Sequence, residues 1–224
     1  MKYISVAVDG PAGSGKSTIT KMVAKDLGYN YVDTGAMYRA LTYNFLKNNL
    51  TELDEKKIEL LLSKVKFEVK FIDRVQYVFV NGEDVSEKIR TAEVSKFTSL
   101  FAKSPAVREF LIDTQRNLAM SNNIIMDGRD IASVVLPNAD VKIFLTASVE
   151  ERARRRVLDF ERQGVVDIDF DKVKADIAAR DYQDENRDIA PLVKVDDAVL
   201  IDTTNLTITE VVEKMTELIK KAEV

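Results

Sequence analysis

The sequence of 224 residues contains no cysteine and no histidine. The absence of cysteine excludes disulfide bonds and thiol chemistry, and the absence of both residues excludes a zinc site built from them. Histidine is also the commonest general base in enzymes. In this chain, therefore, proton transfer has to use a carboxylate, and an anionic ligand has to be held by lysine or arginine.

Long hydrophobic stretches are also missing. The apolar run within residues 1–9 is too short for the core of a signal peptide with its cleavage site, and no stretch is long enough to span a membrane. We therefore expect a cytoplasmic protein without a membrane partner. The net charge is −4, whereas a protein that binds a nucleic-acid polymer usually carries a broad basic surface. A small anionic substrate in a local basic pocket is compatible with this charge.

Short apolar runs alternate with helical patterns along the chain, which is typical of an α/β domain with a parallel sheet. The first expected helix ends at Gly28, and the last begins at Thr207, where Glu210 completes a capping box. Helices are expected to flank one five-stranded parallel sheet, with its strands at residues 3–9, 31–33, 124–127, 141–146 and 198–202.

Between residues 64 and 86 the hydrophobic period changes to two. Apolar residues alternate with charged ones over 64–71, and a second alternating run over 75–80 ends at Asn81-Gly82, a strong signal for a hairpin turn. We interpret this segment as a small antiparallel sheet inserted into the α/β domain. Because an isolated hairpin is only marginally stable, we expect it to pack on the rest of the domain.

Residues 10–17 match the pattern G-x-x-x-x-G-K-S/T between the first expected strand and helix, the context that confirms a phosphate-binding loop (P-loop). The glycines let backbone N–H groups turn toward phosphate oxygens at a helix N-terminus, and a chance glycine-rich turn is the alternative. Lys16 is expected to reach the β- and γ-phosphates, and the Ser17 hydroxyl to bind Mg²⁺. The residues expected to bind ATP here are Gly10, Pro11, Ala12, Gly13, Ser14, Gly15, Lys16, Ser17 and Thr18.

A P-loop indicates a nucleoside triphosphate but does not by itself distinguish kinases from GTPases and ATPase motors. The sequence has no Asn-Lys-x-Asp, so the guanine-reading motif of GTPases is missing, and no Leu-Ser-Gly-Gly, which disfavours a transporter-type ATPase. The chain is also short for a mechanical domain. These absences favour a kinase for a small acceptor.

Two segments carry the charges that such a kinase needs, because an anionic acceptor would otherwise repel the donor phosphates. Thr34 and Arg39 follow the second expected strand, where Thr34 could instead cap the next helix. Asp127 ends a strand at the position expected of the carboxylate that binds Mg²⁺. Arg129 and Asp130 follow it over the carboxyl ends of the strands, where a surface turn with an internal ion pair is the alternative.

Ser148–Glu151 has the pattern of a capping box at the start of a further helix. Arg152, Arg155 and Arg156 then follow at i, i+3 and i+4, so they share one helix face. Three arginines on one face repel one another unless anions neutralise them. Nearby carboxylates could do so, but we favour the phosphates of ATP.

Arg180, Asp184 and Arg187 lie at i, i+4 and i+7 and are therefore expected on one face of another helix. Intrahelical ion pairs explain such a spacing, and from the spacing alone we prefer that interpretation. The sequence Ala190-Pro191-Leu192 follows directly.

Four segments resemble, in order and spacing, those of the bacterial cytidylate kinases of the nucleoside monophosphate kinase superfamily. They are residues 9–17, 33–39, 127–130 and 180–192, and residues 89–91 and 107–109 also look like family segments. The resemblance runs across nearly the whole chain, and the segments 33–39 and 127–130 together are specific for it. Thr34 stands where some members carry serine, which keeps the hydroxyl. The inserted sheet is similar to the enlarged monophosphate-binding region that separates this family from adenylate kinases.

The resemblance implies which residues bind the acceptor: Thr34, Arg39, Ser99, Arg108, Arg129, Asp130, Arg180, Asp184 and Arg187. The arginines at 39, 129 and 187 would bind the CMP phosphate, to which a guanidinium donates two parallel hydrogen bonds. Ser99, Arg108 and Asp130 would read cytosine, whose amino group suits a carboxylate acceptor. Asp184 and Arg180 would hold the ribose.

By the same resemblance, Arg152, Arg155 and Arg156 would form a lid that closes over ATP and excludes water. The expected reaction converts ATP and CMP or dCMP into ADP and CDP or dCDP, with Mg²⁺, by positioning and charge neutralisation. A kinase for UMP, AMP or shikimate and a P-loop nucleotide switch are the alternatives. The residues expected to act in catalysis are Lys16, Asp127, Arg129 and Arg155.

We expect residues 1–224 to form a single monomeric P-loop kinase. Its core would comprise about 1–35, 95–147 and 188–224, its monophosphate-binding region about 36–94, and its helical lid about 148–187.

Overall fold

Five parallel strands form the central sheet of the computed structural model, which describes residues 3–223. The order across the sheet is β2–β6–β1–β7–β8. This confirms the predicted sheet, although the first strand begins at Ser5 rather than at residue 3, and the last at Val199 rather than at residue 198. Residues 1, 2 and 224, which belong to the predicted core ranges, lie outside the described residues. The strands are β1 (Ser5–Asp9), β2 (Asn30–Asp33), β6 (Ile124–Gly128), β7 (Val141–Thr146) and β8 (Val199–Asp202).

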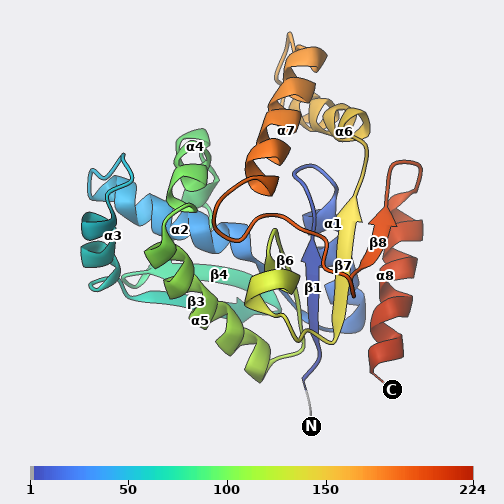
Figure 1. The fold of residues 1–224 in the computed structure, drawn as a ribbon, viewed down its shortest axis with the longest axis horizontal. Coiled ribbons are helices and arrows are strands. Elements are labelled where there is room, and N and C mark those ends of the chain that lie inside the picture. The colour runs from blue at the N-terminus through green and yellow to red at the C-terminus, as the bar shows by residue number, and fades with distance from the viewer. Residues whose placement is uncertain (1–2, 224) are drawn as a thin grey trace.

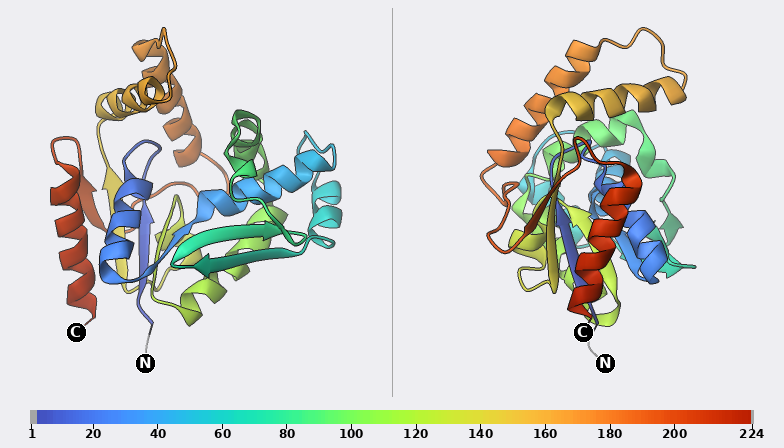
Figure 2. Two further views of the ribbon diagram at one scale, coloured as in Figure 1. Left: turned by 180° about the vertical axis from the view of Figure 1, so that it is seen from behind. Right: turned by 90° about the vertical axis from the view of Figure 1, so that its right-hand side faces the viewer.

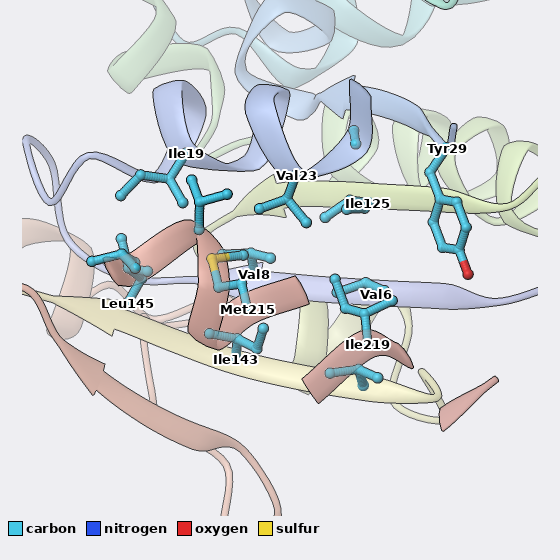
Figure 3. Packing of buried hydrophobic residues seen from close by; sticks show 14 of the residues in the cluster. Val6, Val8, Ile19, Val23, Tyr29, Ile125, Ile143, Leu145, Met215 and Ile219 are labelled. Carbon is cyan, nitrogen blue, oxygen red and sulfur yellow. The ribbon is translucent and has the colours of Figure 1, made fainter. Parts of the chain in front are cut away.

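Helices α1 (Lys16–Leu27) and α8 (Ile208–Ala222) cover one face of this sheet. Val6 and Val8 of β1 point toward them, as Figure 3 shows, while Ala7 points to the other face. This alternation follows from the two-residue period of a strand. Gly28 in the left-handed conformation ends α1, and the capping box at Thr207 and Glu210 begins α8, so both predicted helix ends are confirmed.

The opposite face of the sheet is covered by α2 (Thr34–Lys47) and α5 (Pro105–Ser121), and α3 (Glu55–Leu62) packs on α5 farther from the central strands. Fully buried residues from several elements meet there, including Met37 and Leu41 of α2 and Met126 of β6. Both faces of the sheet are therefore buried, as is usual for parallel sheets. The carboxyl ends of all five strands lie together at one end of the sheet.

The predicted antiparallel insertion is a three-stranded sheet of β3 (Phe67–Ile72), β4 (Val75–Val80) and β5 (Glu83–Asp84). The Asn81-Gly82 turn joins β4 to β5, as predicted. Asp73-Arg74 makes a second two-residue turn between β3 and β4, with φ of 50° and 65° despite the absence of glycine. The sheet packs on α2, and a 3₁₀ turn (Lys88–Arg90) leads from it to α4 (Ala92–Phe101).

Helices α6 (Val149–Arg162) and α7 (Phe170–Glu185) extend beyond the carboxyl ends of the central strands, at the top of Figure 1 and in both views of Figure 2. The predicted capping box of α6 is only half formed. Ser148 Oγ accepts from the Glu151 N–H, but the Ser148 N–H donates to Thr204 Oγ1, because Glu151 uses its carboxylate to bind Arg154 and Arg155. Over residues 3–223, no helix combines the length and the apolar character needed to cross a membrane.

Candidate active site

The P-loop connects β1 to α1 at the carboxyl edge of the sheet. Gly10 is required at its start, since a Cβ atom there would lie 2.0 Å from the main-chain oxygen of Leu145 in β7. Gly15 precedes α1 with φ of 88°, a conformation that glycine adopts at little cost. It contributes no capping side chain, and the first helical turn contains no acidic residue. The N-terminal N–H groups of α1 are thus suited to phosphate oxygens.

Lys16 spans this loop. Its Nζ donates to the carbonyl oxygens of Gly10 at 2.6 Å and Pro11 at 2.7 Å, and to Ser14 Oγ at 3.3 Å. Burial, followed by repulsion from Arg129, holds the pKa of Lys16 well below its usual value. The negative charge of a bound triphosphate would favour the protonated ammonium.

Asp127 is the last residue but one of β6 and lies opposite Asp33 of β2 in the strand register. Its Oδ2 accepts from Ser17 Oγ at 2.6 Å and its Oδ1 from the Tyr31 hydroxyl at 3.0 Å. Burial, and then repulsion from Asp33, raises the pKa of Asp127 to about 6. Mg²⁺ takes one or two protein oxygens and fills its other positions with water and substrate phosphates, so this hydroxyl–carboxylate pair fits that ion.

Asp33, which the sequence reasoning did not select, organises the start of α2. Its Oδ1 accepts from the Ala36 N–H at 2.8 Å, so Asp33 caps the helix, and the alternative role of Thr34 as the cap is wrong. Thr34 instead donates its hydroxyl hydrogen to the Asp127 carbonyl at 2.7 Å. Asp33 Oδ2 also accepts from Arg39 at 2.9 Å, which directs that guanidinium toward the strand ends.

Ion pairs between elements, rather than within α7, hold the next group of predicted residues. Arg129 Nε donates to Asp184 Oδ2 at 2.8 Å, which ties α7 to the segment after β6. Arg187 lies beyond the end of α7 and pairs with Asp130, so the prediction of an intrahelical ladder is wrong. Desolvation, and then repulsion from Arg129, lowers the pKa of Arg180, as expected where cations gather.

Asp130 is buried between two arginines. Arg108 NH2 donates to its Oδ2, and Arg187 NH2 to its Oδ1 at 3.4 Å. The Arg108 guanidinium lies 5.9 Å from the centre of the Tyr38 ring, so an aromatic face adjoins this pair. Ser99, the third residue expected to read cytosine, is exposed on α4, and among residues 3–223 no hydrogen bond joins it to Arg108 or Asp130.

A single π-helical turn (Ile131–Val135) follows Asp130 and depends on a residue that the sequence reasoning did not select. The buried Asp9 carboxylate accepts from the N–H groups of Ile131 at 2.9 Å and Ala132 at 2.7 Å. Asp9 directly precedes Gly10, so one side chain fixes the P-loop relative to the segment that carries Arg129 and Asp130.

The three arginines of α6 occupy different surroundings. Arg152 is buried and binds the carbonyl oxygens of Ala12 at 3.0 Å and Ala147 at 2.9 Å, and Asp181 of α7 at 2.6 Å. Asp181 thus neutralises Arg152, and Glu151 neutralises Arg155. The phosphates of ATP are therefore not needed to relieve the repulsion between these two arginines. These bonds place Arg152 against the P-loop backbone from the lid side.

Arg155 lies over the P-loop, where its NH1 is 3.7 Å from the position of a Cβ on Gly15. Its guanidinium donates to Glu151 at 3.0 Å and to the Thr203 carbonyl at 2.7 Å. Arg156 is exposed and lies 4.5 Å from the centre of the Phe160 ring. The loop after β8, which contains Thr203, therefore borders the phosphate site.

Comparisons with known proteins identify the family of this chain. Residues 6–221 match the sequence pattern of the family described as cytidylate kinase. Proteins named cytidylate kinase from Caldicellulosiruptor bescii and Lactobacillus johnsonii are each 50% identical to this chain, over 99% and 98% of its length and 97% and 95% of theirs. A third, from Bacillus velezensis, is 47% identical over 98% of each chain.

Solved structures of low identity show the fold alone. A shikimate kinase from Bacteroides thetaiotaomicron has a TM-score of 0.50 at 14% identity and covers 97% of this chain and 98% of its own. An uncharacterized protein from Eubacterium ventriosum has a TM-score of 0.52 at 12% identity with the same coverage. The fold is that of a P-loop kinase, and on its match over residues 6–221 the chain belongs to the cytidylate kinase family.

Proposed function

We propose that the protein transfers the γ-phosphoryl group of ATP to CMP and dCMP. The observation that carries this proposal is the convergence of the P-loop, the Ser17–Asp127 pair and several arginines at the carboxyl ends of β1, β2 and β6. An oxygen of the CMP phosphate attacks the γ-phosphorus, the bond to the β–γ bridging oxygen breaks, and ADP leaves. Because the acceptor is already an anion, no general base is needed, which suits a chain without histidine.

On the donor side, the P-loop N–H groups and Thr18 hold the phosphates of ATP. Lys16 exchanges its contacts with the loop carbonyls for the β- and γ-phosphates and stabilises the transferring group. Ser17 and Asp127 hold Mg²⁺, which when bound neutralises phosphate charge. Arg155 supplies a further cation from α6. Arg152 supports the P-loop through its hydrogen bond to the Ala12 carbonyl, and Arg156 approaches the phosphates from the exposed side.

On the acceptor side, Arg39, Arg129 and Arg187 bind the CMP phosphate, and Thr34 lies beside them. Asp33 and Asp184 already orient two of these guanidiniums, so the cations are placed before the substrate arrives. Arg180 and Asp184 hold the ribose.

Asp130 reads cytosine together with Arg108 and Ser99. A carboxylate held by arginines accepts from the cytosine amino group, whereas uracil presents an oxygen there and would leave the carboxylate unpaired.

We further propose core limits of about 1–35, 95–147 and 188–224, an acceptor region of about 36–94 and a lid of about 148–187. We also propose that the protein acts as a cytoplasmic monomer on these small nucleotides.

The test measures ADP release by purified protein with ATP, Mg²⁺ and, in separate reactions, CMP, dCMP, UMP, AMP and shikimate, and quantifies the phosphorylated acceptor. We expect ADP and CDP in equal amounts, with CMP or dCMP as the best acceptor. Slow ADP release without a phosphorylated acceptor would instead indicate a nucleotide switch. A preference for another acceptor would refute the assignment of the base site.

A further inference from the structure

The inserted sheet makes a polar contact with the central sheet at Asp33. Since β2 is the edge strand of the central sheet, the main chain of Asp33 lacks a neighbouring strand on its outer side. The Gln76 side chain of β4 fills this place. Its Oε1 accepts from the Asp33 N–H at 2.7 Å, and its Nε2 donates to the Asp33 carbonyl at 3.2 Å. A side-chain amide thus makes both bonds that a further strand would make.

A second contact from the same hairpin supports this docking. The turn before Gln76 carries Arg74, whose guanidinium lies against Gly28. A Cβ atom placed on Gly28 would be 2.5 Å from the NH1 atom of Arg74. Gly28 ends α1 just before β2 begins, and Asp33 is the last residue of β2. The tip of the hairpin therefore reaches β2 near both of its ends, and the Gln76 amide lies against the end that faces the active site.

Asp33 gives this contact its functional meaning. Its carboxylate caps α2 by accepting from the Ala36 N–H and also accepts from Arg39. Any shift of the Asp33 main chain would move both the carboxylate that binds Arg39 and the start of α2. The P-loop, by contrast, follows β1, which lies two strands away from β2. The effect should therefore reach the acceptor site more than the ATP site.

We propose that Gln76 is a positioning residue for the acceptor, which links the inserted sheet through Asp33 to Arg39. It touches no substrate in this scheme. The alternative is that Gln76 only fastens the hairpin to the domain and affects stability alone. The inference rests on the proposed function, because Arg39 is assigned there to the CMP phosphate.

The test is Gln76→Leu, which removes both hydrogen bonds at similar size, with Tyr77→Phe on the next position of β4 as the matched control. We expect kcat/KM for CMP to fall about tenfold, consistent with the loss of two hydrogen bonds, while KM for ATP changes less than about twofold. The control should resemble the wild type in both. If Gln76→Leu does not fold by circular dichroism, Gln76→Glu keeps the acceptor for the Asp33 N–H and should show the same split between substrates.

A double-mutant cycle with Arg39→Ala separates positioning from fastening. If Gln76 acts through Asp33 and Arg39, adding Gln76→Leu to Arg39→Ala should lower kcat/KM for CMP by less than about twofold. A further tenfold loss in that background, or equal effects on CMP and ATP, would overturn the inference. A wild-type protein that phosphorylates no monophosphate would refute the proposed function instead, so the two failures are distinguishable.

Discussion

Replacing Asp9 by asparagine should remove the part of the pH dependence of folding stability that comes from this carboxyl group. Burial raises the pKa of Asp9 from 3.8 to about 6, although two backbone N–H groups stabilise the carboxylate. The folded state therefore holds this proton more tightly than the unfolded chain does. The stability that comes from this binding is fully present below about pH 3.8 and is lost as the pH rises through about 6.

The magnitude follows from the two pKa values. Their difference corresponds to about 3 kcal/mol in full, of which about 2 kcal/mol falls between about pH 4.5 and pH 7.5. Asparagine keeps one acceptor and loses the other, which costs about 1–3 kcal/mol at every pH. Urea unfolding of both proteins at the two pH values measures the stability of each. We expect the advantage of the wild type over Asp9→Asn to shrink by about 2 kcal/mol from the lower to the higher pH.

The comparison isolates Asp9 and its interactions with Asp130 and Lys16, because the remaining titrating groups are common to both proteins and cancel in the difference. An advantage that stays constant within about 0.5 kcal/mol over this range would show that Asp9 titrates alike in both states, and the burial argument would be refuted. An advantage that grows with pH would mean that the two N–H groups outweigh burial and lower the pKa.

Three further substitutions test the proposed site. Lys16→Met should nearly abolish turnover and leave the melting temperature unchanged within a few degrees, and activity within about tenfold of wild type would contradict its role at the transferring phosphoryl group. Arg155→Ala should lower kcat strongly with little change in CMP affinity measured without ATP, whereas an equal loss of that affinity would contradict a role in the lid. Asp130→Asn should lower kcat/KM for CMP by a factor that corresponds to about 1–3 kcal/mol of transition-state stabilisation, and it should narrow the preference for CMP over UMP. An unchanged ratio would leave Asp130 as an ion-pair partner of Arg108 and Arg187.

Local patterns predicted those parts of the site that one strand and the following turn build. The P-loop and Asp127 were found because the carboxyl ends of parallel strands meet at one edge of the sheet. Asp9 and Asp33 also end strands of that sheet, so the same signal was present for them and was not used.

Partners that come from distant segments were not predictable from spacing. Arg187 seemed to continue the face of α7, but the helix ends before it and the chain turns back to Asp130. Arg152 seemed to need an external anion, but α7 folds back on α6 and brings Asp181 against it. Gln76 gave no signal at all, because its role depends on which strand of the central sheet lies at the edge.

The place of β1 between β6 and β7 has a consequence for biosynthesis. Ser5 pairs with the start of β6, about 120 residues later in the chain, and β7 follows later still. At roughly 5–20 residues per second, a ribosome needs about 6–24 s to make that intervening stretch. The apolar β1 and its P-loop therefore leave the ribosome long before either neighbouring strand exists. The first segment of the nucleotide site to be synthesised is among the last to gain its folded surroundings, and in that interval β1 is available to chaperones and to other nascent chains.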